Sequence, residues 1–312
     1  MTSALVYDES FLRHKTGRHP ENPERLSRII RALESDHVLW DALTKISPSP
    51  ASENDISTCH GNGLIDHIRQ LCERGEPFID LDTRISPESF GIARLAAGAA
   101  VAGVDCVIAG QEIQNAFALV RPPGHHATPN RAMGFCLFNN AAIAARYAQS
   151  RYGVERVLIV DWDVHHGNGT QDIFYGDDTV FYFSTHQYPF YPGTGSRGER
   201  GDGKGEKYTL NAPLDQGTPA RTHREVFSQA LLAIEKMFPP DLVIISAGFD
   251  AHFDDPLGGL KLEDEDFAEM TKEVIGLAER HGEGRVVSIL EGGYNLETLG
   301  ETVRTHIAAL SA

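Results

Sequence analysis

The sequence predicts an α/β fold in which one parallel sheet is covered by helices on both faces. Short apolar runs rich in Val and Ile alternate along the chain with segments of helical periodicity, and the runs lack the polar–apolar alternation of half-exposed strands. Polar clusters follow these runs directly, which is typical of sheets whose ligand site lies beyond the carboxyl ends of the strands. The 312 residues contain no internal repeat and no evident linker, so we expect one domain over residues 1–312.

The elements can be placed along the chain from these patterns. The predicted strands lie at 116–120, 156–160, 179–185, 241–246 and 285–290. The predicted helices lie at 22–35, 87–110, 141–150 and 263–282. Asn22 is the expected cap of the first helix, with Pro23 in its first turn. The acidic run 263–266 is expected at a helix N-terminus, where negative charge is favourable. The glycine-rich segment 192–206 predicts a long loop.

The composition excludes several classes of protein. The formal charge is −16, from 28 Lys and Arg against 44 Asp and Glu, which argues against a nucleic-acid-binding surface. No apolar run approaches the roughly 20 residues that span a bilayer, and the N-terminus lacks the pattern of a signal peptide, so we expect no membrane association and a cytoplasmic location. The four cysteines form no C-x-x-C pair, so reduced thiols are expected.

Polar clusters stand at the ends of five predicted strands, where the site is expected. They read RPPGHH, DWDVHHGNG, STH, SAGFDAH and EGGYNL in chain order. A single cluster of this kind could be a set of polar contacts that only stabilises the fold. Because the carboxyl ends of parallel strands meet at one edge of a sheet, five clusters predict a functional site at that edge.

A metal site is the first chemistry that these clusters support. Asp163 and His165 are two residues apart, so they point to the same side of an extended segment. Asp250 offers a second carboxylate, and two carboxylates with one imidazole leave an open position at a catalytic Zn²⁺ or Fe²⁺. A solvated turn remains the alternative for the short D-x-H pattern taken by itself.

Proton transfer is the second chemistry. His125 and His126 are adjacent, and a histidine of near-neutral pKa suits the hydrolysis of an amide assisted by a metal. Asp161 and Asn168 supply an acceptor for each imidazole, which is the arrangement that orients such rings. Tyr294 follows two glycines and could stabilise a developing oxyanion. The alternatives are loop histidines bound by backbone, a turn-capping aspartate and a tyrosine that only packs.

The clusters together resemble the motifs of one enzyme family. RPPGHHA, GFCLFNN, DWDVHHGNGTQ, SAGFDAHFDDPLGG and LEGGYNL are similar to those of the zinc-dependent histone deacetylase family, in the family's order. The class II branch and its bacterial relatives, which include histone deacetylase-like amidohydrolases and acetylpolyamine amidohydrolases, are the nearest in pattern. The resemblance runs from about Tyr7 to about Leu299. It implies a single catalytic domain with a three-layer, arginase-like fold and a central, mainly parallel sheet of about eight strands.

The resemblance also implies a role for each polar residue of the site. It implies that Zn²⁺ is bound by Asp163, His165 and Asp250. The implied catalytic groups are His126 as general base and acid with Asn168, His125 with Asp161 as electrostatic support, and Tyr294 at the scissile carbonyl. His166, by contrast, is expected only to support the fold.

Potassium binding is implied as well, mostly through backbone carbonyls. The positions that match a first K⁺ site beside the zinc are Asp161, Asp163, His165, Ser184 and Thr185. The positions that match a second K⁺ site are Phe174, Asp177, Val180 and Tyr208.

Five further residues match the family's substrate tunnel. Phe135 and Tyr191 match its aromatic walls, although many relatives have Phe where Tyr191 stands. Gly134 matches the position whose carbonyl accepts the substrate amide proton, and Asp82 loosely matches a rim aspartate that grips the peptide backbone. Relatives specialised for acetylated polyamines can place an acid where this chain has Leu257, which weakens that interpretation here.

The sequence thus predicts a Zn²⁺-dependent amidohydrolase that removes acetyl or other acyl groups from the ε-amine of lysine in peptides or proteins. An acetylpolyamine deacetylase is the main alternative, and the chain is expected to act as a monomer or a homo-oligomer. A binding protein without catalysis would not need the proton-transfer histidines. A manganese ureohydrolase of the same fold would need further carboxylates for a second metal, which the GFDAHFDD segment does not clearly supply.

Overall fold

The computed structural model describes residues 2–110 and 112–312 and contains one eight-stranded sheet in the order β2-β1-β3-β8-β7-β4-β5-β6. Every strand pair in it is parallel. The strands are β1 (Thr2–Val6), β2 (Thr44–Ile46), β3 (Ile113–Ala118), β4 (Val157–Asp161), β5 (Val180–Gln187), β6 (Thr209–Leu214), β7 (Leu242–Ala247) and β8 (Val286–Leu290). The predicted α/β class with a parallel sheet is therefore confirmed.

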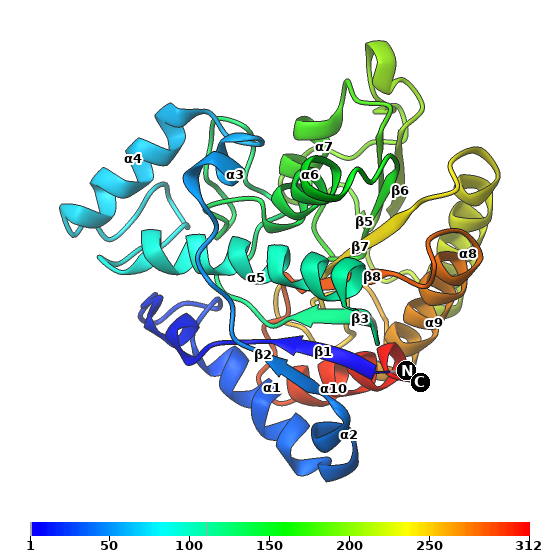
Figure 1. The fold of residues 1–312 in the computed structure, drawn as a ribbon, viewed down its shortest axis with the longest axis horizontal. Helices are drawn as coiled ribbons and strands as arrows, with labels where there is room; N and C mark the ends of the chain where they lie inside the picture. The colour runs from blue at the N-terminus through cyan, green and yellow to red at the C-terminus, as the bar shows by residue number, and fades with distance from the viewer. Residues whose placement is uncertain (1, 111) are drawn as a thin grey trace.

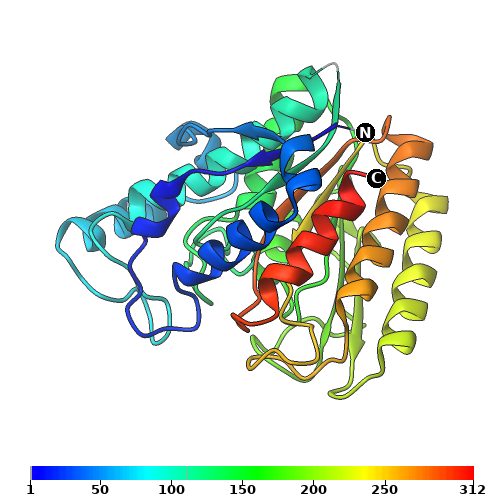
Figure 2. The ribbon, with the colours of Figure 1, turned by 90° about the horizontal axis from the view of Figure 1, so that it is seen from below.

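The helices surround this sheet in two layers. The α-helices are α1 (Glu24–Ser35), α2 (His37–Ala42), α3 (Glu53–Ser57), α4 (Asn62–Glu73), α5 (Ser89–Ala109), α6 (Asn140–Tyr152), α7 (Asn168–Phe174), α8 (Ala220–Met237), α9 (Asp264–His281) and α10 (Leu299–Leu310). Two short 3₁₀ helices are η1 (Glu9–Arg13) and η2 (Gly203–Gly205). Helices α1, α10, α9 and α8 pack side by side along one face, as Figure 2 shows, and α3 to α7 cover the other face (Figure 1).

The five strands predicted from apolar runs are β3, β4, β5, β7 and β8, and they are neighbours in the middle of the sheet. They are almost entirely buried, which is why they read as continuous Val- and Ile-rich segments. The sequence patterns did not reveal β1 and β2 at one side of the sheet or the edge strand β6. Helices α1, α5, α6 and α9 match the four predicted helices within two residues at each end.

Two local predictions about helix starts are also confirmed. The side chain of Asn22 accepts a hydrogen bond from the Glu24 amide at 2.9 Å, at the start of α1. At the start of α9, Glu263 and Asp266 form a capping box, in which each side chain accepts a hydrogen bond from the backbone of the other. The acidic run therefore stabilises a helix terminus.

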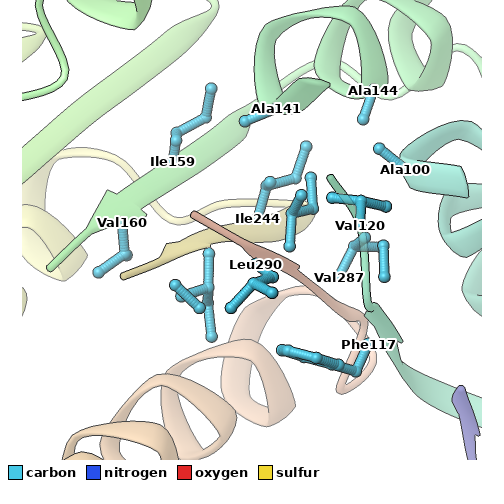
Figure 3. Close-up of a cluster of buried hydrophobic side chains, with 14 of the residues drawn as sticks. Ala100, Phe117, Val120, Ala141, Ala144, Ile159, Val160, Ile244, Val287 and Leu290 are labelled. Atoms are coloured by element: carbon cyan, nitrogen blue, oxygen red, sulfur yellow. The ribbon is translucent and has the colours of Figure 1, made fainter. Parts of the chain in front are cut away.

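The core fills both sides of the sheet (Figure 3). On one side α5 lies close to the strands, because a side chain at Gly103 would meet Val287 of β8 and Ala116 of β3. On the opposite side the ring of Phe117 contacts His306 of α10, with ring centroids 5.5 Å apart. Small residues on α5 and α6 thus let these helices approach the central strands closely.

Helix α5 corrects the prediction that no segment is long and apolar enough to span a bilayer. Over Ser89–Ala109 it has the length and composition of a membrane span. However, 61% of its most apolar window is buried inside the fold, and it packs against α6, β3 and β8. A core helix enclosed by other elements has the same composition, so one such helix is weak evidence for membrane insertion.

Candidate functional site

The carboxyl ends of the five central strands converge on one pocket of about 540 Å³. His126 comes from the loop after β3, His165 from the segment after β4, Tyr191 from the loop after β5, and Tyr294 from the turn after β8. The pocket is lined by Asp82, His126, Gly134, Phe135, His165, Gln187, Pro189, Phe190, Tyr191, Gln216, Pro256, Leu257, Gly258, Gly259 and Tyr294. The convergence expected from the polar clusters is therefore present in the fold.

Asp163, His165 and Asp250 form a group that could hold a metal ion. One ligand atom from each lies within 4.8 Å of the others. The Nδ1 of His165 is 3.1 Å from Oδ1 of Asp163 and 3.1 Å from Oδ2 of Asp250. The backbone amide of Gly292 donates to Asp163 at 2.9 Å, and that of Val164 donates to Asp250 at 2.8 Å. These amide bonds fix the carboxylates, as expected for oriented metal ligands.

The electrostatics of this group fit a divalent cation. Asp163 and Asp250 are both fully buried, which is costly for ionised carboxylates unless positive charge is close. Burial, together with the charge of Asp163, raises the pKa of Asp250 to about 7. Two buried carboxylate oxygens with one imidazole nitrogen suit a metal that keeps an open position.

The tandem histidines stand beside this group with different partners. The Nδ1 of His126 lies 2.8 Å from Oδ1 of Asn168, at the start of α7. The Nδ1 of His125 lies 3.1 Å from Oδ2 of Asp161, at the end of β4. Both histidines are buried, and their rings are 4.0 Å apart. The pairing of two imidazoles with two acceptors is therefore the one expected from the sequence.

The surroundings of the two imidazoles shift their pKa values in opposite directions. Burial and the neighbouring imidazoles His125 and His165 lower the pKa of His126 well below its usual value. Burial also opposes charge on His125, but the carboxylates of Asp163 and Asp161 overcome this and raise its pKa well above the usual value. The site therefore holds one neutral imidazole next to one that favours the protonated form.

Tyr294 is held on a turn of glycines after β8. Its backbone amide donates to Oδ2 of Asp255 at 2.6 Å, and the guanidinium of Arg25 lies over its ring, 4.9 Å from the centroid. Arg25 also donates to the carbonyls of Glu291 and Gly293, both at 2.6 Å. Burial raises the pKa of the Tyr294 hydroxyl well above its usual value, so the phenol stays protonated and can donate a hydrogen bond.

The five residues assigned to a substrate tunnel all line the pocket. Gly134 and Phe135 have positive φ angles of 56° and 71°, and a side chain at Gly134 would collide with the ring of His126. The ring of Tyr191 lies edge-on to His126 with centroids 5.1 Å apart. Asp82 and Leu257 lie on separate loops, and the amide of Leu257 donates to Asp255 at 2.9 Å.

The residues matched to potassium sites lie at two places around β5. Asp161 of β4 pairs in register with Ser184 of β5, and the Thr185 side chain lies 3.0 Å from the Nε2 of His223. The second set lies at the turn between α7 and β5 and at the start of β6. In this set the Asp177 carboxylate accepts from Thr179 at 2.6 Å and pairs with Arg146 at 2.5 Å.

Several residues of the site were not found from the sequence. Phe190 stacks on His165, with ring centroids 5.2 Å apart and planes at 14°. Glu291 is fully buried beneath the tandem histidines, although the sequence marked it only as part of EGGYNL.

His166 turns away from the metal group, as expected for a supporting residue. Its ring nitrogens lie 2.8 Å from the Thr194 side chain and 3.1 Å from the Gln171 side chain.

Comparisons with known proteins agree with this geometry. The histone deacetylase domain family matches residues 19–310. The chain is 40% identical to a "probable deacetylase" of Archaeoglobus fulgidus, over 100% of this chain and 86% of that protein. It is also 40% identical to a "histone deacetylase-like amidohydrolase" of Pseudomonas aeruginosa, over 89% and 73%. The crystal structure of the HDA15 HD domain superposes with a TM-score of 0.93 at 39% identity, over 99% of this chain and 88% of that one. The chain belongs to the histone deacetylase family.

Proposed function

We propose that this protein is a Zn²⁺-dependent deacetylase that removes acetyl or other acyl groups from the ε-amine of lysine in peptides or proteins. The observation that carries this proposal is one pocket in which a potential metal group, a neutral imidazole and a protonated phenol meet beneath aromatic walls. Amide hydrolysis needs an activated water, a proton carrier and a donor for the oxyanion, and each of these has a residue here.

Asp163, His165 and Asp250 are the residues that would hold Zn²⁺. A bound Zn²⁺ would supply Lewis-acid polarisation of the acyl carbonyl and would lower the pKa of the attacking water. Gly292 and Val164 hold the two carboxylates through their amides, so the ligand atoms keep their positions before and after a cation binds.

His126 is the proposed general base and acid. Its lowered pKa keeps it neutral and able to accept the proton of the attacking water. The acceptor oxygen of Asn168 holds the proton on Nδ1, which leaves Nε2 as the basic nitrogen. The same Nε2 then returns the proton to the departing amine. His125, paired with Asp161, adds positive charge beside the developing oxyanion.

Tyr294 is the proposed oxyanion donor. Its phenol stays protonated because burial raises its pKa, and the amide bond to Asp255 fixes the turn that carries it. The carbonyl of Gly134 would accept the N–H of the scissile amide, between Phe135 and Tyr191. Such preorganised donors and acceptors favour the transition state over the substrate.

The lining of the pocket favours an acyl-lysine peptide over an acetylated polyamine. A polyamine carries further ammonium groups, which need a carboxylate partner when they leave water. Leu257 occupies the wall position where a carboxylate would serve this purpose, whereas Asp82 lies at the rim, where it can accept backbone N–H groups of a peptide. Deacetylation of small acetylated amines such as N-acetylputrescine is the alternative.

Potassium binding is proposed for the backbone carbonyls at the two matched places. The first comprises Asp161, Asp163, His165, Ser184 and Thr185, and the second Phe174, Asp177, Val180 and Tyr208. A monovalent cation next to Asp161 would neutralise charge behind His125 and leave the ring free to act on the substrate.

A deacylation assay with a chelator control tests the proposal. The zinc-loaded enzyme should hydrolyse an acetyl-lysine peptide faster than N-acetylputrescine, and a chelator should abolish the reaction until Zn²⁺ is restored. Asp163→Ala should lose both activity and bound zinc by elemental analysis, and stoichiometric zinc in this variant would refute the ligand assignment. Leu257→Glu should shift the preference toward N-acetylputrescine, and a wild type that prefers N-acetylputrescine would support the alternative.

A further inference from the structure

Glu291 is a buried carboxylate that the proposed reaction does not use directly. It directly follows β8 and is fully buried. Its Oε2 accepts hydrogen bonds from the backbone amides of Gly124 at 2.6 Å and His125 at 3.1 Å. Its Oε1 accepts one from the Ser246 hydroxyl of β7 at 3.1 Å. The carboxylate therefore joins the tandem-histidine loop to two central strands.

The chain that follows Glu291 touches the other parts of the site. The next amide, of Gly292, donates to the potential metal ligand Asp163 at 2.9 Å. Two residues further on, the amide of Tyr294 donates to Asp255 at 2.6 Å. Three residues within a stretch of four, Glu291, Gly292 and Tyr294, thus contact the histidine loop, the metal group and the segment that fixes the phenol.

The histidine loop has little freedom on its other side. A side chain at Gly124 would collide with the backbone at the start of α6, at the amide of Asn140. The loop is therefore enclosed between α6 and the Glu291 carboxylate. Without that carboxylate the amides of Gly124 and His125 would be buried donors without acceptors, which is unfavourable for the observed position of the loop.

We propose that Glu291 is a positioning residue, whose carboxylate sets the place of His125 and His126 relative to Tyr294. This inference rests on the proposed deacetylase function. The two hydrogen bonds from the amides of Gly124 and His125 fix the backbone of the loop itself, whichever rotamer the side chains adopt. The histidines and the phenol act on the same carbonyl, and a misplacement of about 1 Å between such groups can reduce a rate by about 10²-fold.

Three substitutions separate the geometry of Glu291 from its charge. In Glu291→Gln the carbonyl oxygen can still accept from Gly124 and His125, while the amide donates to Ser246, so the loop keeps its place without the charge. In Glu291→Asp the charge remains, but the side chain is one methylene too short to reach the loop. Glu291→Ala removes both the charge and the acceptor.

The readouts are kcat and KM of the zinc-loaded enzyme on an acetyl-lysine peptide, with zinc content and melting temperature measured for each variant. We expect Glu291→Gln to retain kcat within about tenfold, and Glu291→Asp and Glu291→Ala to lose about 10–10²-fold in kcat. KM should change less than threefold, roughly, because Phe135 and Tyr191 lie on other loops. If Glu291→Ala does not fold, the contrast in kcat between Glu291→Gln and Glu291→Asp alone tests the positioning role.

Ser288→Ala is the matched control. Ser288 is buried on β8, the strand that Glu291 follows, but its hydroxyl lies 2.8 Å from His306, away from the site. This substitution should lower the melting temperature and leave kcat unchanged. Full activity in Glu291→Asp together with impaired activity in Glu291→Gln, or an unchanged kcat in Glu291→Ala, would overturn the positioning role. A wild type that is inactive on every acylated substrate would instead reject the proposed function.

Discussion

The Nδ1 of His126 lies 2.8 Å from Oδ1 of Asn168, so the group behind this imidazole is an uncharged amide. The neighbouring His125 has the carboxylate of Asp161 in the same position, at 3.1 Å. Burial opposes a charge on both rings, but the carboxylates of Asp163 and Asp161 raise the pKa of His125, whereas burial and the imidazoles of His125 and His165 lower the pKa of His126. In the proposed mechanism His126 is accordingly the neutral, proton-accepting group and His125 the charged, supporting one.

Asn168→Asp should therefore move the acidic limb of the activity profile to higher pH. A carboxylate behind His126 raises the pKa of the imidazole, so the neutral base form is lost at a higher pH than in the wild type. The measurement is kcat/KM against pH on an acetyl-lysine peptide. An unchanged acidic limb in a folded, zinc-loaded variant would show that His126 is not the base.

Tyr294→Phe should fold and keep its metal but lose most activity. Removal of one oxyanion donor typically costs about 10²–10³-fold in kcat. The hydroxyl is the only group removed, while the amide bond to Asp255 and the contact of Arg25 with the ring remain available. Single-turnover rates with matched zinc content test this, and wild-type kcat would exclude an oxyanion role.

Gly134→Ala should damage the site more than the fold. Gly134 has φ +56°, and an added Cβ would collide with the ring of His126. Gly153 has a similar φ of +68° but open space around its Cβ, so Gly153→Ala carries the backbone strain of about 1 kcal/mol without the collision. We expect Gly153→Ala to lose stability through the strain alone and to keep kcat, and Gly134→Ala to lose kcat as well as additional stability through the collision. Equal kcat values for Gly134→Ala and Gly153→Ala would show that the close approach of Gly134 to His126 does not matter for activity.

The central strands and their polar ends could be predicted because buried parallel strands leave a strong local pattern. Examples are the run VLIV before Asp161 and the run LVIIS shortly before Asp250. In both cases the polar residues of the site follow the apolar run closely. The strands β1, β2 and β6 were missed because they are short or mixed in composition, and their pairing depends on contacts far away in the chain. Helix α5 has a strong local pattern that is ambiguous, because an enclosed core helix can have the same composition as a membrane span.

The supporting residues of the site could not be predicted, because their partners lie far away in the sequence. Glu291 bonds to residues 166 and 167 positions away, and Arg25 bonds to carbonyls 266 and 268 positions away. A charged residue directly after an apolar strand, as in SILEGG, was the one local signal for Glu291. A buried arginine on an ordinary helix leaves no such signal.

Buried neutral histidines should make the protein lose stability between pH 6.5 and 4. Burial lowers the pKa of His60 from 6.5 to about 4. Its Nε2 accepts the Asn139 amide at 2.9 Å, so a proton there would break this bond at the cap of α6. Burial also lowers the pKa of His306, to about 3.

The direction of this pH dependence follows from which state, folded or unfolded, binds more protons. As pH falls from 6.5 to 4, the unfolded chain takes up a proton on His60 and the folded protein does not, so the free energy of unfolding decreases. The slope from one such group reaches about 1.4 kcal/mol per pH unit. Glu291 opposes part of this, since burial raises its pKa to about 7 and its contribution falls as pH rises toward that value.

His60→Gln should reduce the slope of unfolding free energy against pH in this window, whatever its effect on stability at pH 7. His37 is exposed on α2, so His37→Gln serves as the control and should leave the slope unchanged. Denaturant unfolding at several pH values between 4 and 7 gives the slopes directly. If the wild type and His60→Gln have the same slope, His60 does not hold its neutral form in the fold, and the bond from the Asn139 amide is not what excludes the proton.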